Sequence, residues 1–455
     1  MMKKIALVST AITFALSASC VQAKVSEAEA AKLGNELTPV GGVKAANADG
    51  SIPEWKGGIT TVPAGYKAGD HHPNPFPDDK PLFEITSANY KEYAEFLTDG
   101  QMKLFETYPD SFKMPIYQTR RSASLPEYAY AATKKNAVSA ELVESGNGVR
   151  NSSVSVPFPI PKNGLEAIWN HILRYRGPAI QRFGGQAAPT ASGSYNIIGF
   201  DDVLMMKYAE EGATPEQLMQ DNMVLKFKQK VTEPARLAGT ALLVHETMDQ
   251  VKQPRMAWTY NTGQRRVRRA PNVAYDAPGT ASDGLRTSDD FDMFNGAPDR
   301  YNWTLKGKRE LYIAYNNYNL HSDQISYEDI LKPGHIEPSY TRFEKHRVWV
   351  VEADLKEGLR HVYQKRVFYI DEDSWQIQVA DVYDSRNELY RVAVAYGINY
   401  YEVPTHWSTL EVYHDLNSRR YLALGLDNEA QMYDFSIKLD DKEFTPQALR
   451  REGLR

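Results

Sequence analysis

From about residue 223 to residue 437, apolar and polar side chains alternate with a period of two, which is the pattern of half-buried β-strands. In one such run, Trp375, Ile377 and Val379 share a face, and Gln376 lies on the other. A sheet is therefore expected to be the main structural element of the chain. The strand candidates fall near 223–231, 238–247, 255–261, 265–270, 309–315, 342–353, 360–370, 375–383, 389–398, 409–414, 420–424 and 433–437.

The connections between many of these strands are short. Residues 371–374 and 384–387 are turn sequences rich in Asp, Ser and Asn. Parallel strands need crossovers of roughly a dozen residues or more, so these turns predict an antiparallel meander. The stretch 272–303 interrupts the meander with repeated Pro and Gly, and a long insertion of this kind is expected to act as a lid or binding loop.

The part of the chain before the meander, residues 24–221, is rich in proline and loops. Tyr90, Tyr93 and Leu97 form the apolar stripe of one predicted helix, and a second helix is predicted near 164–174. We expect these helices to cover the sheet that the meander forms over 222–440. Residues 24–455 would then form a single domain of the mainly β, α+β class.

The amino terminus has the features of a secretory signal peptide, residues 1–23. A basic start, an apolar stretch over 5–18 and small side chains before the cut predict cleavage after Ala23. That stretch is shorter than the roughly 20 residues of a membrane-spanning helix, so no transmembrane span is expected in the mature chain. An alternative interpretation makes Cys20 the lipidated first residue of the mature chain. Against it, Ser17 occupies the position where the lipoprotein signal prefers Leu. Both predict an envelope protein, located in the periplasm or associated with the outer membrane.

The charge balance excludes one class of partner. The chain has 53 Lys and Arg against 58 Asp and Glu, a net charge of −5. Non-specific nucleic-acid binding needs an excess of cations that displace counterions, so no nucleic-acid partner is expected.

Aromatic residues make up 11% of the chain and are concentrated in the predicted sheet and its insertion. The run Val348–Val351 is apolar on both faces, so either the protein's own helices or a ligand must cover the second face of the sheet. The aromatic candidates for contacting a hydrophobic ligand are Trp258, Tyr260, Phe291, Phe294, Trp303, Trp349, Tyr369 and Trp375.

Four arginines, Arg265, Arg266, Arg268 and Arg269, follow a predicted strand. In an extended segment the first and last lie on one face and the middle two on the other. Because buried cations need partners, these arginines either form cross-strand ion pairs or provide an anion site at the rim of a pocket.

The sequence contains no familiar catalytic motif: it lacks a nucleophile elbow, a phosphate loop and a dinucleotide fingerprint. His71 and His72 fit a surface loop better than a metal site, and the acidic clusters 289–292 and 371–373 lack calcium-loop spacing. Glycoside hydrolysis stays open, because its two carboxylates need only meet in space. We expect a protein that is not an enzyme and has no metal or cofactor.

Three long strings, at 37–55, 258–271 and 366–375, resemble the Gram-negative envelope family called domain of unknown function 1329. The resemblance covers nearly the whole mature chain. It implies a fold similar to the carriers and receptors of outer-membrane lipoprotein sorting, a half-open antiparallel β-barrel around helices. It also implies a companion envelope protein and resistance-nodulation-division exporters as partners, and it carries no catalytic residues.

These observations support three hypotheses. The first is a periplasmic, non-enzymatic carrier or chaperone that holds a lipid-like or acylated molecule in a concave sheet, with 272–303 as its lid and the arginines of 265–269 at an anionic head. The second is an envelope protein that bridges an exporter and the outer membrane and has no ligand of its own. The third, an outer-membrane barrel, is disfavoured by the helix- and loop-rich part 24–221.

Overall fold

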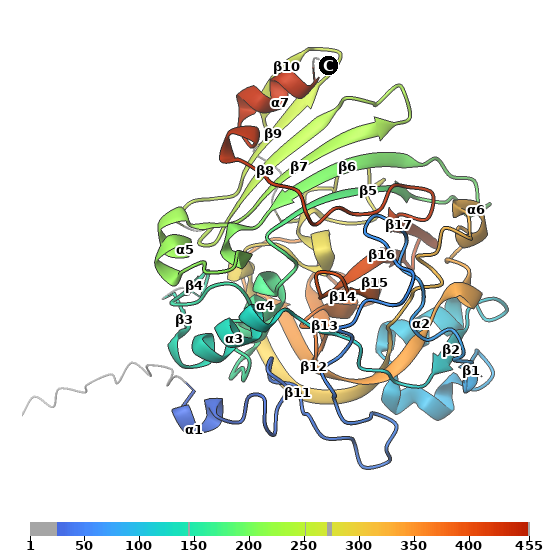
Figure 1. Cartoon of the computed structure of the whole chain (residues 1–455). Coiled ribbons are helices and arrows are strands. Elements are labelled where there is room, and N and C mark those ends of the chain that lie inside the picture. Colours follow the sequence, from blue (N-terminus) through green and yellow to red (C-terminus); the bar gives the residue numbers. More distant parts are fainter. Residues whose placement is uncertain (1–24, 144–145, 251, 271–274, 454–455) are drawn as a thin grey trace, which may run out of the picture.

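The computed structural model describes residues 25–143, 146–250, 252–270 and 275–453. The predicted signal peptide, with Cys20, lies outside the described residues. The main element is one large, curved sheet, around which the helices and long loops are arranged (Figure 1).

The strands of this sheet are β1 (Phe83–Ile85), β2 (Met114–Tyr117), β5 (Ala179–Ala187), β6 (Ile198–Met205), β7 (Met223–Glu233), β8 (Ala241–Thr247), β9 (Met256–Asn261), β10 (Arg266–Arg269), β11 (Tyr301–Ala314), β12 (Phe343–Leu355), β13 (Lys365–Asp371), β14 (Ile377–Tyr383), β15 (Leu389–Tyr400), β16 (Thr405–Asp415) and β17 (Arg420–Leu426). Two short strands, β3 (Glu141–Leu142) and β4 (Val149–Arg150), form a separate pair.

The helices and 3₁₀-helices are α1 (Glu27–Ala30), η1 (Tyr90–Phe96), α2 (Asp99–Thr107), α3 (Glu127–Ser139), α4 (Gly164–Leu173), η2 (Lys207–Ala209), α5 (Pro215–Asp221), η3 (Ser288–Met293), η4 (Pro298–Arg300), α6 (Tyr327–Ile330), η5 (Pro338–Tyr340), η6 (Asp441–Glu443) and α7 (Pro446–Gly453). Of the helices in the described ranges, none is long and apolar enough to span a bilayer.

The strand order is β1–β2–β12–β13–β14–β15–β16–β17–β5–β6–β7–β8–β9–β10, with β11 beside β12. Neighbouring strands are antiparallel except β2 and β12, which are parallel. Within the described residues β10 pairs only with β9, and β11 only with β12, so the sheet is open and does not close into a barrel. The predicted class, mainly β with a large curved antiparallel sheet covered by helices and loops, is confirmed.

Both faces of the strands β12–β17 are covered by the protein itself. On β13, Phe368 and Ile370 pack into a core cluster that includes Trp169 of α4, whereas Val367 and Tyr369 pack into another that contains α2 and β1 side chains. Of the two explanations for the doubly apolar strand 348–351, coverage by the protein's own elements is the one observed.

The sheet also extends into the part of the chain for which the sequence predicts only a covering layer. β5 and β6 precede residue 221, yet they lie in the middle of the strand order. β5 pairs with β17 through Ala423–Ala187 and two further residue pairs. The tract Ala179–Ala187 holds two adjacent glycines and Arg182, which hides its strand period. Conversely, the strand predicted at 433–437 is not observed. Asp434 forms only an isolated β-bridge to Gln181.

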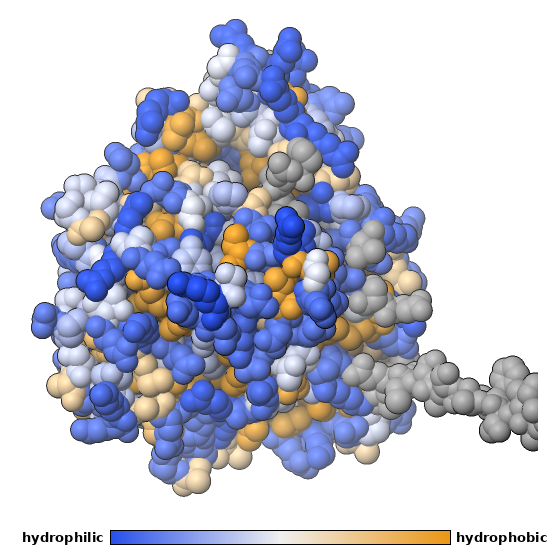
Figure 2. All heavy atoms as spheres, turned by 180° about the vertical axis from the view of Figure 1, so that it is seen from behind, coloured by the Kyte–Doolittle hydropathy of each residue, from blue (hydrophilic) through white to orange (hydrophobic). Residues whose placement is uncertain are grey.

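The strands β8–β10 have an outer face that α7 covers at the top of the view in Figure 1. Leu449 of α7 and Phe444 before it pack with Leu243, Trp258 and Tyr260 in a small core cluster. The inner face of the same strands is turned toward the insertion between β10 and β11. From behind, the surface is mostly hydrophilic, with separate apolar patches in its upper half (Figure 2).

Asp381 of β14 is a fully buried carboxyl beneath the start of α2. It accepts hydrogen bonds from the Thr98 hydroxyl at 3.1 Å and the Tyr369 hydroxyl at 3.3 Å. Burial is the main reason why its pKa is raised from 3.8 to about 7. The native state therefore retains a proton that the unfolded chain releases, and the contribution of this group to stability falls as pH rises from 3.8 to about 7.

We expect Asp381→Asn to be more stable than the wild type at pH 8 by about 1–2 kcal/mol, because the amide is not charged and its oxygen keeps the Thr98 contact. Urea unfolding at pH 5 and pH 8 measures the difference. A difference of the same size at both pH values would show that ionisation of Asp381 is not the cause.

Candidate ligand-binding pocket

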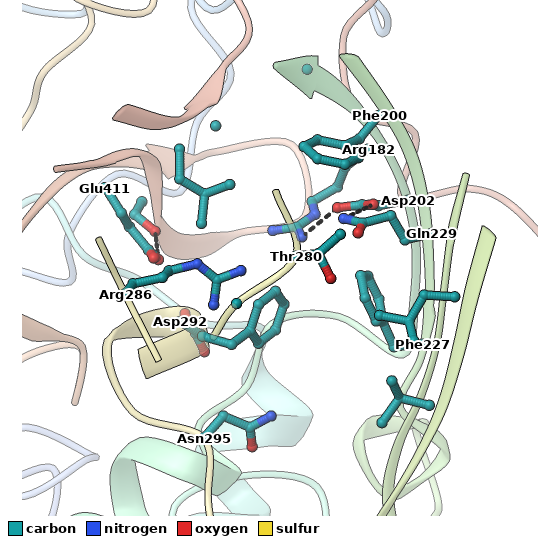
Figure 3. A pocket seen from close by; sticks show the side chains of 18 of the residues that line it. Arg182, Phe200, Asp202, Phe227, Gln229, Thr280, Arg286, Asp292, Asn295 and Glu411 are labelled. Carbon is teal, nitrogen blue, oxygen red and sulfur yellow. Dashed lines mark hydrogen bonds and ion pairs between the residues drawn. The ribbon is translucent and has the colours of Figure 1, made fainter. Parts of the chain in front are cut away.

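A pocket of ≈ 110 Å³ lies between the inner face of β5–β8, the insertion and the strands β16 and β17 (Figure 3). The residues that line it are Arg182, Phe183, Gly184, Gly185, Phe200, Asp202, Leu225, Phe227, Gln229, Leu242, Val244, Glu246, Arg255, Gly279, Thr280, Arg286, Ser288, Phe291, Asp292, Asn295, Ser408, Thr409, Glu411, Leu424, Gly425 and Tyr433.

Strand alternation builds the apolar wall of the pocket. On β7, Leu225 and Phe227 line the pocket, and Lys226 between them forms an ion pair with Asp441 beside α7 on the outer face. Val244 of β8 lies directly opposite Phe227 in the register. Phe291 of the insertion completes the wall, with its ring centroid 5.4 Å from that of Phe227.

A polar row crosses the same wall. Arg182 of β5 forms an ion pair with Asp202 of β6 at 3.0 Å, and the Gln229 amide of β7 donates to Asp202 at 2.9 Å. The Arg182 guanidinium carbon lies 4.9 Å from the centroid of the Trp407 ring. Burial raises the pKa of Asp202 even though Arg182 opposes the shift. At another part of the wall, Glu246 pairs with Arg255 at 2.5 Å.

Glu411 of β16 is a buried carboxyl in the pocket whose side-chain hydrogen bonds come from hydroxyl groups. It accepts hydrogen bonds from Ser408 at 2.9 Å and from Tyr413 at 2.6 Å. Burial, followed by the charge of Asp292, raises the pKa of Glu411.

Buried ion pairs hold the insertion in place over the sheet. Asp292 pairs with Arg174 at 2.6 Å and with Arg176, both of which follow α4, and accepts a bond from Trp407 Nε1 at 3.0 Å. Asp289 pairs in the same way with Arg366 of β13 at 2.6 Å. The Asp cluster 289–292 is therefore an anchor for the insertion.

A family model described as "Protein of unknown function (DUF1329)" matches residues 84–450. The chain belongs to the DUF1329 family. An uncharacterized protein of Pseudomonas aeruginosa, PA3922, is 52% identical over 453 residues, which is 99% of each chain.

Two solved structures show a partial similarity to this chain. A DUF1329 family protein from Desulfovibrio piger is 13% identical, with a TM-score of 0.41 over 60% of this chain and 92% of that one. A LolA superfamily protein from Nitrosomonas europaea, NE2245, is 14% identical, with a TM-score of 0.37 over 63% of this chain and 98% of that one. The DUF1329 match confirms the family resemblance inferred from the sequence. The description of the family names no function.

In this DUF1329 chain, only Phe291 of the twelve predicted ligand-binding residues lines the pocket. Trp258 and Tyr260 face away from it, because they share the outer face of β9 with the residues under α7. Tyr369 lies in the core cluster under α2. The alternation in the sequence does not indicate which face of these strands borders a hollow.

The remaining aromatic candidates fill the protein's own core. Phe294, Trp303 and Phe368 pack together, with the Trp303 and Phe368 ring centroids 5.9 Å apart. Trp349 and Trp375 stack with centroids 6.0 Å apart. Trp303 also lies in β11, which begins at Tyr301, so the insertion ends earlier than predicted.

The four predicted anion-binding arginines lie outside the pocket. Arg265 is in the turn before β10, and Arg266, Arg268 and Arg269 are in β10, at the edge of the sheet. All four are exposed, and among the described residues none forms an ion pair with a carboxylate. Neither the predicted cross-strand pairs nor a place at this pocket's rim is observed.

His346, Asp371 and Asp373 bring potential ligand atoms within 4.8 Å of one another, deep in the core. Both carboxylate oxygens of Asp373 accept hydrogen bonds from Arg121 at 2.8 Å. This geometry fits a buried ion pair better than a metal site, because the guanidinium already supplies the positive charge.

His72 corrects the prediction of a surface loop. It is only 3% exposed, and its ring bonds Glu402 at 2.8 Å and His321 at 3.1 Å. The structure gives it a place inside the fold, with protein partners on both ring nitrogens.

Two larger depressions, of ≈ 560 and ≈ 460 Å³, lie on the outer side of the strands beside the C-terminal segment. Their walls contain ion-paired side chains, such as Lys226 with Asp441 and Lys228 with Glu452. The pocket under the insertion combines an apolar wall with buried polar groups, which is the composition of small-molecule sites, and is the better candidate.

Proposed function

We propose that this protein is a non-enzymatic carrier of the cell envelope that binds a lipid-like, hydrophobic molecule in the pocket under the insertion. The observation that carries the proposal is the wall of Leu225, Phe227, Leu242 and Val244, which faces a hollow on the inner side of the sheet, while the other face of β8 packs against α7. Burying each methylene of a ligand against such a wall is worth about 0.8 kcal/mol.

The volume of the pocket limits what it holds in this conformation. At ≈ 110 Å³ it is of the same order as a cavity of roughly 150 Å³ that admits a benzene-sized group. It therefore accepts a head group and the first methylenes of a chain. A longer chain extends along the sheet only if the insertion, residues 275–300, moves outward.

A series of straight-chain alcohols from hexanol to hexadecanol tests the proposal through displacement of a neutral fluorescent probe. We expect affinity to rise by about 0.8 kcal/mol, or roughly fourfold, for each methylene that enters the pocket, and then to level off once the pocket is full. Organic extraction of natively purified protein should release a lipid-like molecule. No binding at any chain length, together with an empty extract, would contradict the proposal.

A second candidate function is an envelope protein that bridges partners such as an exporter and an outer-membrane protein. The observation in its favour is the β10 edge, where Arg266, Arg268 and Arg269 are exposed beside unpaired backbone groups. A photo-crosslinker at position 268 in intact cells would trap a protein under this hypothesis, whereas a free carrier leaves it unreacted. For both candidates we propose the periplasm as the location.

A further inference from the structure

We propose that the ligand of this pocket carries an acidic head group and that Arg286 binds it. This inference rests on the proposed function and adds the charge of the ligand. The anion-binding role that the sequence suggested for the arginines of 265–269 is here assigned to Arg286, which lies on the insertion.

Arg286 is a buried cation that forms no ion pair with any of the described carboxylates. Its residue is 7% exposed, and its Nη1 donates only to the carbonyl of the neighbouring Thr287, at 3.3 Å. Its Nε has no hydrogen-bond partner, and no carboxylate among the described residues forms an ion pair with it. Figure 3 shows the guanidinium reaching from the insertion into the pocket.

Each of the other guanidinium groups around the pocket has a carboxylate partner. Arg182 pairs with Asp202, Arg255 with Glu246, and both Arg174 and Arg176 with the single carboxylate of Asp292. Glu411, the remaining carboxyl of the lining, is bonded by two hydroxyls instead of by Arg286. The pocket therefore has an excess of positive charge, and an uncompensated buried cation is costly until an anion joins it.

The surroundings of Arg286 are suited to an amphipathic anion. Gly279 leaves room for the guanidinium, since a Cβ at that position would lie 2.8 Å from Arg286 Cζ. On the sheet side, Phe227, Leu242 and Val244 supply the apolar contacts that an attached chain needs. A carboxylate or a phosphate accepts two parallel hydrogen bonds from a guanidinium, so both head groups satisfy the site chemically.

Calorimetry on the full-length mature protein compares three ligands with the same chain length: dodecanoate, dodecyl phosphate and 1-dodecanol. The comparison distinguishes the contribution of the head-group charge to affinity from that of the alkyl chain. We expect the wild type to bind at least one of the two anions about 10- to 100-fold more tightly than the alcohol. Arg286→Met should abolish that preference and leave the affinity for 1-dodecanol unchanged. The preferred anion identifies a carboxylate or a phosphate as the head group.

Two further variants test whether the effect is specific to the position of the Arg286 guanidinium. Arg266→Met removes an exposed arginine from β10 and should retain the full preference for the anion. Gly279→Ala keeps every charge but displaces the Arg286 guanidinium, so it should weaken binding of the anion and not of the alcohol. Arg286→Met should also unfold at a temperature no lower than the wild type, because it removes an unpaired buried cation.

The outcomes distinguish this inference from the proposed function. If the wild type binds neither the alcohol nor the anions, the proposed function fails. If the wild type binds alcohol and anions equally, or if Arg286→Met keeps the preference, the proposed function stands and the role of Arg286 is wrong.

Discussion

Replacing Asp292 with Asn is expected to lower the free energy of unfolding by about 3–5 kcal/mol. The substitution leaves Arg174 and Arg176 buried without a counter-ion, although both were paired with this one carboxylate. Asp292 adopts a left-handed backbone conformation with φ of 54°, which Asn also tolerates, so the loss is electrostatic rather than conformational. Urea unfolding of both proteins at pH 7 measures it.

The pH dependence of this effect follows from the ion pairs. Burial alone would raise the pKa of Asp292, but Arg174 and Arg176 outweigh it and hold the pKa below its usual value. A lowered native pKa gives stability that is present above pH 3.8 and is lost only as pH falls below it. Asp384, in the turn before β15, provides the control: it pairs with Arg386, whose side chain is 68% exposed, and Asp384→Asn should change stability by less than about 1 kcal/mol. Equal effects of the two substitutions would contradict the anchoring role.

Leu242→Trp is expected to reduce the affinity for 1-dodecanol by more than about 100-fold while the protein stays folded. Leu242 is half-buried on the inner face of β8, where a larger ring fills the pocket in place of the ligand. Excluding four methylenes at about 0.8 kcal/mol each removes roughly 3 kcal/mol of binding free energy. Displacement of the neutral probe gives the affinity, and circular dichroism reports the fold.

The same substitution at a distant exposed leucine controls for the chemistry of the added ring. Leu82 is 66% exposed, lies before β1 and does not line the pocket, so Leu82→Trp should bind the alcohol like the wild type. If Leu242→Trp binds normally, the ligand occupies another site, and the depressions beside the C-terminal segment become the next candidates.

The sequence predicted the fold well where a strand has one consistent period. β14 and β15 were placed to within about two residues, because apolar side chains alternate with polar ones along their length and Asp-rich turns separate them. β5 was missed because Gly184 and Gly185 interrupt its pattern, and β11 was begun late because its exposed half, from Asn302 to Glu310, has little apolar character.

The pocket could not be predicted from the sequence, for a different reason. An inward-facing Phe227 and an outward-facing Trp258 look alike in a period-two pattern, and only the packing of α7 decides which face is filled. No sequence pattern singled out Arg286, because one arginine in a glycine-rich insertion is unremarkable. Only the structure shows that the carboxylates described around it form no ion pair with it. The four adjacent arginines of 265–269 drew the prediction instead, yet they lie in solvent.

The seam between β5 and β17 sets the order in which this sheet can be completed. β6 follows β5 directly in the chain, but the partner on the other side, β17, begins only at Arg420. Until the last part of the chain is in place, β5 presents an open row of backbone donors and acceptors to any other strand it meets. Pairing across so long a stretch of sequence makes folding slow, so this half-formed sheet is the species most prone to aggregation and the one that a folding helper would have to protect.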